Sequence, residues 1–305
     1  MILVIGGTGF VGSHLVRRLR QEGLPVRAIV RNPDKARALN DLGVDVVRGD
    51  ISDAASLEKA ATGVERVIHL VGIIQEAPGA TFEGVHVDGT RNILEASRKN
   101  GVRHVFYQSA LGTRPNAKSE YHQTKWAAEE LVRASEIPYT ILRPSLIYGD
   151  GDQFTIRLSE MIRLSPLLPV IGSGRSKVQP IFIDDVATCI VKAVTSDCCL
   201  NEIYEIGGPD QLTYEEITVA IADAMGVKRP TLHLPLFFMK SMATVLKAVL
   251  PKPPVTTDQL IMLQEDTICT MRDIRDAFGI EPIGFPEGLE KFIRPASLEK
   301  AAPRR

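Results

Sequence analysis

The sequence predicts an α/β protein built on a doubly wound parallel sheet, with a smaller and partly discontinuous lobe toward the C-terminus. Short apolar strand patterns alternate with helical patterns through the first half of the chain, and a glycine-rich turn joins the first strand to the first helix. After about Gly149, Pro and Gly become frequent. Strands that are apolar throughout are typical of a parallel sheet covered on both faces. Right-handed crossovers between such strands give the Rossmann-type arrangement.

The individual elements follow from the spacing of apolar residues. In the first half, strands are expected at Ile2–Ile5, Val26–Val30, Val44–Val47, Val67–Val71, His104–Tyr107 and Tyr139–Leu142, with helices at Phe10–Leu19, Thr90–Arg98 and Ala127–Ala134. A strand–helix unit returns at Pro180–Val194, another strand is expected at Ile203–Ile206, and Thr213-x-x-Glu216 has the spacing of a capping box. We therefore expect a Rossmann domain over 1–149 that is completed by about 180–206. The substrate-side lobe is expected over 150–179 and 207–294, followed by a tail at 295–305.

Length, charge and cysteine usage exclude several classes of protein. A chain of 305 residues fits one large domain or two closely joined ones. Its 36 Lys and Arg nearly balance 37 Asp and Glu, so the net charge of -1 gives no general attraction to nucleic acid. The cysteines show no metal-ligand spacing, which predicts structural thiols, no metal site and a reduced, cytoplasmic protein. They are Cys189, Cys198, Cys199 and Cys269.

No targeting segment or membrane span is expected. The first strand runs directly into Gly6, which leaves too short an apolar stretch for a secretory signal. The apolar tract Leu234–Leu250 is broken by Pro235 and two lysines, and it is shorter than the ~20 residues that a membrane span needs. Residues 232–250 have three interpretations: an apolar substrate pocket, a helix that docks on a protein or membrane surface, or ordinary core packing. The side chains concerned are Leu236, Phe237, Met239, Met242, Val245, Leu246 and Val249.

The strongest functional signal is the turn Gly6-Gly7-Thr8-Gly9-Phe10-Val11-Gly12. It follows a predicted strand and opens an amphipathic helix, which is the context that a dinucleotide-binding fingerprint requires. Gly6 permits the tight turn, Gly9 lets the backbone approach a pyrophosphate, and Gly12 allows the helix to pack closely on the strand. The helix N-terminus offers N–H groups and a positive dipole end to the phosphates. We therefore expect a bound dinucleotide at Gly6, Thr8, Gly9, Phe10, Val11 and Gly12.

The end of the second predicted strand indicates which dinucleotide is bound. Sites specific for NAD place an Asp or Glu there, about 20 residues after the glycines, to bind the ribose 2′-hydroxyl. Here the position holds Arg31, 19 residues after Gly12. A guanidinium can bind a 2′-phosphate through two hydrogen bonds, whereas a carboxylate would repel it. NADP(H) is therefore preferred, with NAD(H) as the second candidate and an arginine solvated at a strand end as the structural alternative.

Two further positions fit the rest of a nucleotide. Asp50 and Ile51 follow the third predicted strand, where a carboxylate can accept a hydrogen bond from an adenine amino group; alternatively, Asp50 caps a helix that begins near Ser52. Val71 and Gly72 end the fourth predicted strand. The missing side chain of Gly72 either lets the backbone approach the ribose or belongs to an ordinary turn.

A tyrosine and a lysine have the spacing of a catalytic pair. Tyr121 and Lys125 are four residues apart on a predicted helix that starts after the Asn116–Ser119 loop, so phenol and ammonium share one face. The ordinary pKa of tyrosine, near 10, is too high for efficient acid–base work at neutral pH. A nearby ammonium and the positive nicotinamide ring would favour the phenolate, so we expect the pKa of Tyr121 to be lowered.

These motifs together resemble the extended short-chain dehydrogenases/reductases over at least residues 1–210. The matching segments are Gly6–Gly12, Asp50, Tyr121–Lys125, Leu142-Arg143-Pro144 with Tyr148-Gly149, and Ile183–Val186. Within that superfamily the chain is most similar to the atypical group around accessory subunit nine of mitochondrial complex I and its bacterial relatives, and next to photosystem assembly factors. The resemblance implies that Tyr121 is the acid–base, that Lys125 binds the nicotinamide ribose, and that Pro144 and Ser145 lie beside the nicotinamide ring.

The sequence departs from that family at two positions. By alignment, the substrate-polarising Ser or Thr falls on Ala110, with Ser109 one residue earlier, and the Asn of the family's Asn-Val-x-Gly-Thr is His86. Loss of such a donor typically removes about 3–4 kcal/mol of transition-state stabilisation. His86 either replaces the donor, relays a proton or packs against the backbone. His122 is expected to face solvent, and Asp184 with Asp185 to belong to a helix start.

Two functions therefore remain open. The first is an NADP(H)-dependent oxidoreductase or epimerase that acts on a small carbonyl or hydroxyl substrate, with Tyr121, Lys125 and Ser109 as catalytic residues. The second is a non-catalytic NADP(H)-binding accessory or assembly factor of a respiratory-type membrane complex. The Tyr–Lys pair favours the first, whereas Ala110 and His86 favour the second.

Overall fold

The computed structural model describes residues 1–250 and 253–293. The predicted tail at 295–305 and the side chains of Cys198 and Val249 lie outside the described residues. The chain divides into two compact units. Unit 1 comprises Met1–Pro144, Asp184–Ile206 and Arg272–Ile280, and unit 2 comprises Ser145–Ile183, Gly207–Met271 and Glu281–Arg305.

Unit 1 is built on a seven-stranded sheet with the order β11-β6-β5-β4-β1-β2-β3. All neighbouring strands pair in parallel, which confirms the predicted doubly wound sheet. Strand β4 ends at His69, two residues before the predicted end, so Leu70–Gly72 lies in a loop. The strands are β1 (Ile2–Ile5), β2 (Val26–Val30), β3 (Asp45–Arg48), β4 (Arg66–His69), β5 (His104–Gln108), β6 (Tyr139–Pro144) and β11 (Glu202–Ile206).

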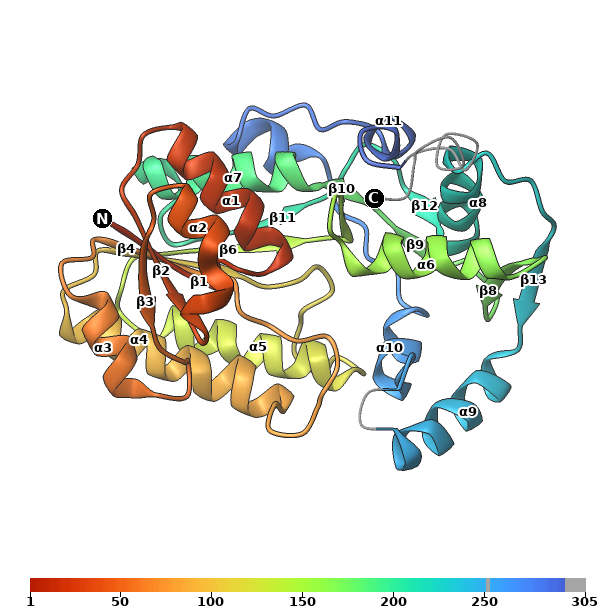
Figure 1. Cartoon of the computed structure of the whole chain (residues 1–305), viewed down its shortest axis with the longest axis horizontal. Coiled ribbons are helices and arrows are strands. Elements are labelled where there is room, and N and C mark those ends of the chain that lie inside the picture. Colours follow the sequence, from red (N-terminus) through yellow and green to blue (C-terminus); the bar gives the residue numbers. More distant parts are fainter. Residues whose placement is uncertain (251–252, 294–305) are drawn as a thin grey trace. The chain divides into compact units, whose positions relative to one another are not determined.

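Helices cover both faces of this sheet (Figure 1). Helices α1 (Phe10–Gln21), α2 (Arg37–Asp41) and α7 (Ile183–Thr195) lie on one face, and α3 (Ala54–Ala61), α4 (Gly89–Lys99) and α5 (Glu120–Arg133) lie on the other. Helix α1 forms because Leu15, Val16 and Leu19 recur at helical spacing and are buried together. A π-helical turn, η2 (Glu83–Asp88), leads directly into α4. Short 3₁₀ turns lie at η1 (Pro33–Ala36) and η3 (Asp197–Cys199).

A late segment of the chain also belongs to unit 1. Residues 272–280, which the sequence-based boundaries assigned to the lobe, include the π-helical turn η4 (Asp273–Ala277) that packs on β11. The backbone N–H of Glu205 donates to an Asp273 carboxylate oxygen at 3.0 Å, and the rings of Tyr204 and Phe278 meet edge to face with centroids 5.0 Å apart. Composition alone does not reveal this return, because the contacts join residues some 70 positions apart.

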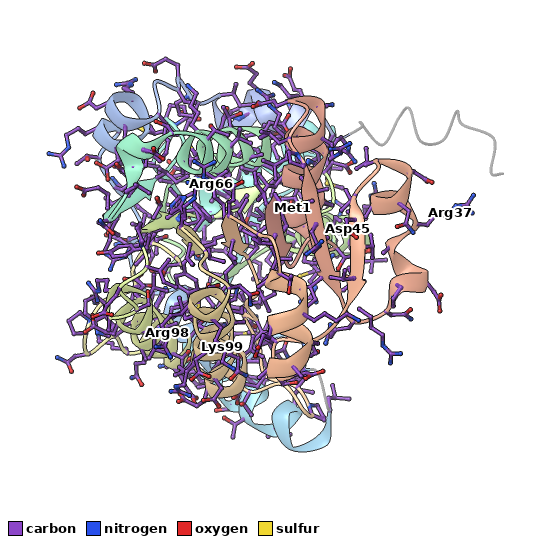
Figure 2. All side chains as sticks on the ribbon, turned by 90° about the vertical axis from the view of Figure 1, so that its left-hand side faces the viewer. Met1, Arg37, Asp45, Arg66, Arg98 and Lys99 are labelled. Carbon is purple, nitrogen blue, oxygen red and sulfur yellow. The ribbon has the colours of Figure 1, made fainter. Side chains whose placement is uncertain are left out.

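The amino ends of the strands form a charged edge of unit 1. Met1, Asp45 and Arg66, which lie at the starts of β1, β3 and β4, face the viewer in Figure 2 together with Arg98 and Lys99 at the end of α4. Ion pairs between exposed or half-exposed groups, such as Arg27 with Asp45 and Lys99 with Glu58, occupy this edge. The opposite edge, at the carboxyl ends of the strands, carries the predicted site residues.

Unit 2 contains three two-stranded sheets and five helices within the described residues. The pairs are β7 (Ile147–Tyr148) with β10 (Ile181–Phe182), β8 (Leu168–Ile171) with β13 (Thr231–Leu234), and β9 (Lys177–Val178) with β12 (Leu212–Thr213). The helices are α6 (Gln153–Leu164), α8 (Tyr214–Ala224), α9 (Leu236–Val249), α10 (Thr257–Met262) and α11 (Phe285–Glu290). Strand β10 therefore lies outside the seven-stranded sheet, which residues 180–183 were expected to help complete.

A helix cap and a cluster of aromatic rings stabilise unit 2. The predicted capping box at Thr213 and Glu216 is confirmed at the start of α8. The buried Tyr148 ring packs edge to face on Phe182 and Phe285, and its hydroxyl donates to the Gly284 carbonyl at 3.1 Å. Among the helices of the described residues, none has both the length and the apolar character needed to cross a membrane.

Candidate nucleotide-binding and catalytic site

The carboxyl ends of the parallel strands bring the predicted site residues of unit 1 to one edge. Strand β1 lies between β2 and β4, so the chain's crossovers leave β1 in opposite directions at this point. Ligands of doubly wound sheets bind outside the carboxyl ends of the strands at such a switch point. Gly6, Arg31, Asp50 and Gly72 all follow strands of this sheet within a few residues, and Ser109 follows β5 directly.

The glycine turn is tight for reasons visible in its backbone. Gly6 has a φ of +98°, which side-chain-bearing residues rarely adopt, and its carbonyl accepts the N–H of Gly9 at 3.0 Å. A Cβ on Gly12 would lie 2.1 Å from the Gly6 carbonyl oxygen, so no side chain fits there. Gly9 is the N-cap of α1, and no side chain caps this helix end. The first N–H groups of α1 therefore lack a capping acceptor and can bind an anion.

Arg31 and Asp50 lie at the ends of adjacent strands. Arg31 is exposed directly after β2, while Asp50 accepts hydrogen bonds from the N–H and the hydroxyl of Ser52 at 2.9 and 2.7 Å. Burial alone would raise the pKa of Asp50, but the bonds from Ser52 and the charge of Arg31 hold it below its usual value. The helix-cap alternative for Asp50 is wrong, because Asp53 is the N-cap of α3. The Asp50 carboxylate therefore stays ionised beside a guanidinium.

Two buried histidines hold the loop after β4. The Val71 N–H donates to Nδ1 of His69 at 3.3 Å, and the Ile73 N–H donates to Nε2 of His86 at 3.1 Å. Burial, together with the nearby charge of Lys125, lowers the pKa of His69 to about 3 and that of His86 to about 2. Both rings are therefore neutral acceptors. His86 matches the third of its predicted alternatives, a histidine packed against the backbone, and its Nδ1 meets the Thr124 hydroxyl at 2.9 Å.

Helix α5 presents the Tyr–Lys pair. Ser119 caps the helix by accepting the N–H of His122 at 3.3 Å, and Tyr121 and Lys125 are both buried. The Lys125 ammonium donates to the Gln108 carbonyl at 2.9 Å and lies 4.9 Å from the centroid of the Tyr107 ring. A Cβ on Gly72 would approach the same nitrogen at 3.1 Å. The end of β5, the loop after β4 and α5 therefore converge on the Lys125 ammonium.

The ammonium of Lys125 has spare donor capacity. Among the described residues its one hydrogen-bond acceptor is the Gln108 carbonyl, although an ammonium carries three N–H donors. Burial lowers the pKa of Lys125 to about 8, and the charge of Glu129 opposes that effect. Buried cations are normally paired or hydrogen-bonded, so an under-satisfied ammonium at a ligand-binding edge indicates a site that a polar ligand completes.

Burial has the opposite effect on the tyrosine from the one predicted. In the protein without cofactor it raises the pKa of Tyr121 to about 12, whereas we expect the neighbouring ammonium and the positive ring of a bound nicotinamide to lower it. His122 was expected to face solvent; this is wrong, because its side chain is buried and Nδ1 lies 2.9 Å from the Ser119 hydroxyl. The rings of His86 and His122 meet that of Tyr121 edge to face, with centroids 5.5 and 5.2 Å away. Tyr121 is therefore a protonated phenol at neutral pH.

Ser109 and Ala110 lie beyond the end of β5. The Ser109 hydroxyl is buried and donates to the Thr113 hydroxyl at 3.4 Å, a weak bond directed within its own loop. Asp184 and Asp185 occupy the first turn of α7, in agreement with the predicted helix start. Within residues 1–250 and 253–293, no three His, Cys, Asp or Glu side chains are grouped in a way that could hold a metal ion.

Two interactions at this edge were not predicted from the sequence. Glu129 is fully buried and forms a two-point ion pair with Arg143 at 2.9 and 2.6 Å, which ties α5 to β6 just before Pro144. The signal was the second i,i+4 step after Tyr121 and Lys125, which places Glu129 on the same face of α5. The His69–Thr90 and His86–Thr124 hydrogen bonds gave no sequence signal, because each joins two different elements.

We expect the Lys125→Met variant without nucleotide to be more stable than the wild type near neutral pH. Because the pKa of Lys125 falls from 10.5 to about 8 on folding, the unfolded chain binds more protons between these values. The wild type therefore gains stability as pH rises through that window, whereas methionine has nothing to titrate. The advantage of the variant should reach up to ~3 kcal/mol and disappear toward pH 10.5. Urea unfolding at both ends of the window measures it; a difference independent of pH would contradict the buried ammonium.

Together, the glycine turn at the uncapped N-terminus of α1, the loop after β4 and the buried Tyr–Lys pair define a dinucleotide-binding protein of the extended short-chain dehydrogenase/reductase type. A family model described as NAD(P)H-binding matches residues 6–197, and the chain belongs to this family. A ceramide reductase of Caulobacter vibrioides is 36% identical over 236 residues, covering 77% of this chain and 74% of that protein. Subunit 9 of the NADH dehydrogenase 1 alpha subcomplex of Arabidopsis thaliana is 31% identical over 280 residues, covering 87% and 70%.

Solved structures share the fold at lower identity. The Citrobacter sp. triphenylmethane reductase complexed with NADP(H) superposes with a TM-score of 0.74 at 23% identity, covering 95% of this chain and 99% of that one. The UDP-glucuronic acid 4-epimerase of Bacillus cereus, in complex with UDP-glucuronic acid and NAD, has a TM-score of 0.73 at 21% identity, covering 95% and 96%. The chain is thus related to NAD(P)-dependent oxidoreductases and epimerases and to complex I subunits.

Proposed function

We propose that this protein is an NADP(H)-dependent oxidoreductase or epimerase that acts on a small carbonyl or hydroxyl compound. The buried Lys125 ammonium carries the proposal. It has one protein acceptor among the described residues, it lies against Gly72, and it shares a helix face with Tyr121. An ordinary structural lysine would not bear the cost of burial with donors unsatisfied. The two hydroxyls of a bound ribose would be the missing acceptors of the Lys125 ammonium.

The residues present fit the rest of an NADP(H) molecule. The uncapped N-terminus of α1, with Gly6, Thr8, Gly9, Phe10, Val11 and Gly12, would hold the pyrophosphate. Arg31 would bind the 2′-phosphate, Asp50 and Ile51 the adenine, and Val71 and Gly72 a ribose. Pro144, at the end of β6, would lie beside the nicotinamide ring. Residues 150–179, 207–271 and 281–293 would contribute to substrate binding, and we place the protein in the cytoplasm.

The chemistry follows from the protonation state of Tyr121. The nicotinamide of a bound NADPH supplies a hydride. With its pKa raised to about 12 by burial, the Tyr121 phenol keeps its proton at neutral pH and can donate it from Oη to a carbonyl oxygen. Lys125 would orient the ribose. A protonated phenol is the form that can act as the general acid in the reduction of a carbonyl.

We expect Arg31→Ala to weaken NADPH binding by about tenfold to a hundredfold while NADH binding stays nearly unchanged. Loss of one charge-assisted hydrogen-bonded contact typically costs about 1.5–3 kcal/mol. Titration of both cofactors against both proteins measures the effect. Arg98→Ala is the matched control, since Arg98 lies at the opposite edge of the sheet (Figure 2). Equal affinities of the wild type for NADPH and NADH would refute the role of Arg31.

A non-catalytic role is the second candidate. The family's substrate-polarising position holds Ala110, and the nearby Ser109 hydroxyl bonds within its own loop. Several relatives are complex I subunits. In that case NADP(H) would stabilise the fold of an accessory or assembly factor, and the buried Tyr–Lys pair would serve binding alone. The Tyr121→Phe variant discriminates between these two functions.

A further inference from the structure

Helix α9 of unit 2 is apolar on two faces. Its inner face is buried, with Met239 and Ala243 packed on Leu260 of α10. Its outer face carries Phe237, Phe238 and Val245, which are 75, 55 and 64% exposed. A cluster of exposed aromatic and branched side chains is unfavourable in water, and such clusters mark surfaces that bind protein or lipid. The outer face of α9 is therefore suited to contact with another molecule or with a membrane.

The charged residues in the sequence around α9 indicate what kind of surface this face binds. From residue 224 to residue 257 the sequence has no Asp or Glu, although acidic residues number 37 in the whole chain. The same stretch holds five basic residues, namely Lys228, Arg229, Lys240, Lys247 and Lys252. Lys240 is exposed on α9 one turn after Phe237. An apolar helix whose own stretch of sequence carries only positive charge is complementary to a surface that is both apolar and anionic.

We propose that α9 docks on an anionic lipid membrane, with Phe237, Phe238 and Val245 in the acyl boundary and Lys240 at the phosphate level. A helix of 14 residues is too short to span a bilayer but suits the plane of its interface. Aromatic and aliphatic side chains enter the headgroup–acyl boundary, and lysine side chains extend back to the phosphates. A nucleic acid offers the negative charge without the apolar layer, so it does not match both halves of this surface.

The proposal is tested by sedimentation of the full chain with lipid vesicles. The wild type should bind phosphatidylcholine vesicles that contain phosphatidylglycerol and should bind pure phosphatidylcholine vesicles much less. The double variant Phe237→Gln/Phe238→Gln should partition roughly tenfold or more weakly, because it loses two inserted aromatic rings. Lys240→Gln should weaken binding to anionic vesicles roughly fivefold, and this effect should shrink in high salt.

The control is Leu164→Gln, which removes a more exposed apolar side chain, 88% exposed, at the end of α6. It should bind vesicles as the wild type does. A wild type that does not bind anionic vesicles would overturn the proposal. So would a double variant that binds them as well as the wild type does, or a control variant whose binding falls as much as that of the double variant. Thermal unfolding of each protein shows whether the variants are folded, so the vesicle test does not depend on NADPH binding or on the proposed function.

A fluorescent reporter on α9 distinguishes contact with lipid from contact with protein. The one natural tryptophan, Trp126, lies on α5 in unit 1, so a Phe237→Trp variant adds a distinct signal on α9. With anionic vesicles its emission should shift to the blue and be quenched by lipids brominated on their acyl chains. A blue-shifted, unquenched emission that is the same with and without vesicles would show that the chain itself, or a second copy, covers α9. That result would also overturn the proposal.

Discussion

Tyr121→Phe should lower turnover at least ~10²-fold while leaving NADPH affinity nearly unchanged, if the proposed chemistry is right. The substitution removes the transferable proton and keeps the ring, so the edge-to-face packing on His86 and His122 survives. Loss of a positioned general acid typically costs two to four orders of magnitude. Steady-state kinetics with a panel of small carbonyl compounds, together with NADPH titration, measure both quantities.

Two controls make this result interpretable. Tyr107→Phe removes another buried tyrosine hydroxyl, on β5 beside Lys125, and it should leave turnover within a few-fold of the wild type. Complementation of a deletion strain then separates the two functions. Full rescue by Tyr121→Phe would rule against the catalytic role and favour the accessory factor, whereas failure of a folded, NADPH-binding variant supports the enzyme.

Gly9→Val should abolish NADPH binding in a chain that still folds. Gly9 has a φ of -78° and a ψ of 176°, an extended conformation that valine adopts readily. The nearest atom to an added Cβ is the Gly6 carbonyl oxygen at 3.3 Å, which a small shift relieves. The valine side chain would stand at the uncapped N-terminus of α1, where the pyrophosphate approaches. Thermal unfolding and NADPH titration of Gly9→Ala and Gly9→Val measure the graded loss.

Gly12→Ala is the matched comparison, because its effect should be on the fold. The added Cβ would lie 2.1 Å from the Gly6 carbonyl oxygen and 2.7 Å from the Gly7 Cα, both backbone atoms that cannot rotate away. Helix α1 would have to move off β1, so the melting temperature should fall along with binding. A folded Gly9→Val protein that binds NADPH as tightly as the wild type would refute the proposed pyrophosphate site at the N-terminus of α1.

The sequence by itself determined the features that depend on residues close together in the chain. The parallel strands follow from short apolar runs, the turn at Gly6–Gly12 from backbone freedom, and the shared face of Tyr121 and Lys125 from helical periodicity. These are local constraints, and the structure reproduces them with boundary shifts of a few residues. The preference suggested by Arg31 is likewise local, since it depends on the residue that ends one strand.

Only the tertiary structure decided the chemical state of the site residues. The pKa of Tyr121 rises, instead of falling, because segments far apart in the chain exclude water from it. His122 is buried for the same reason, and the loop after β4 is held by His69 and His86, which are neutral because they are buried and, secondarily, because the Lys125 ammonium lies nearby. The return of residues 272–280 to unit 1 depends on contacts with β11. Desolvation and long-range pairing are properties of the assembled neighbourhood, and no spacing along the sequence encodes them directly.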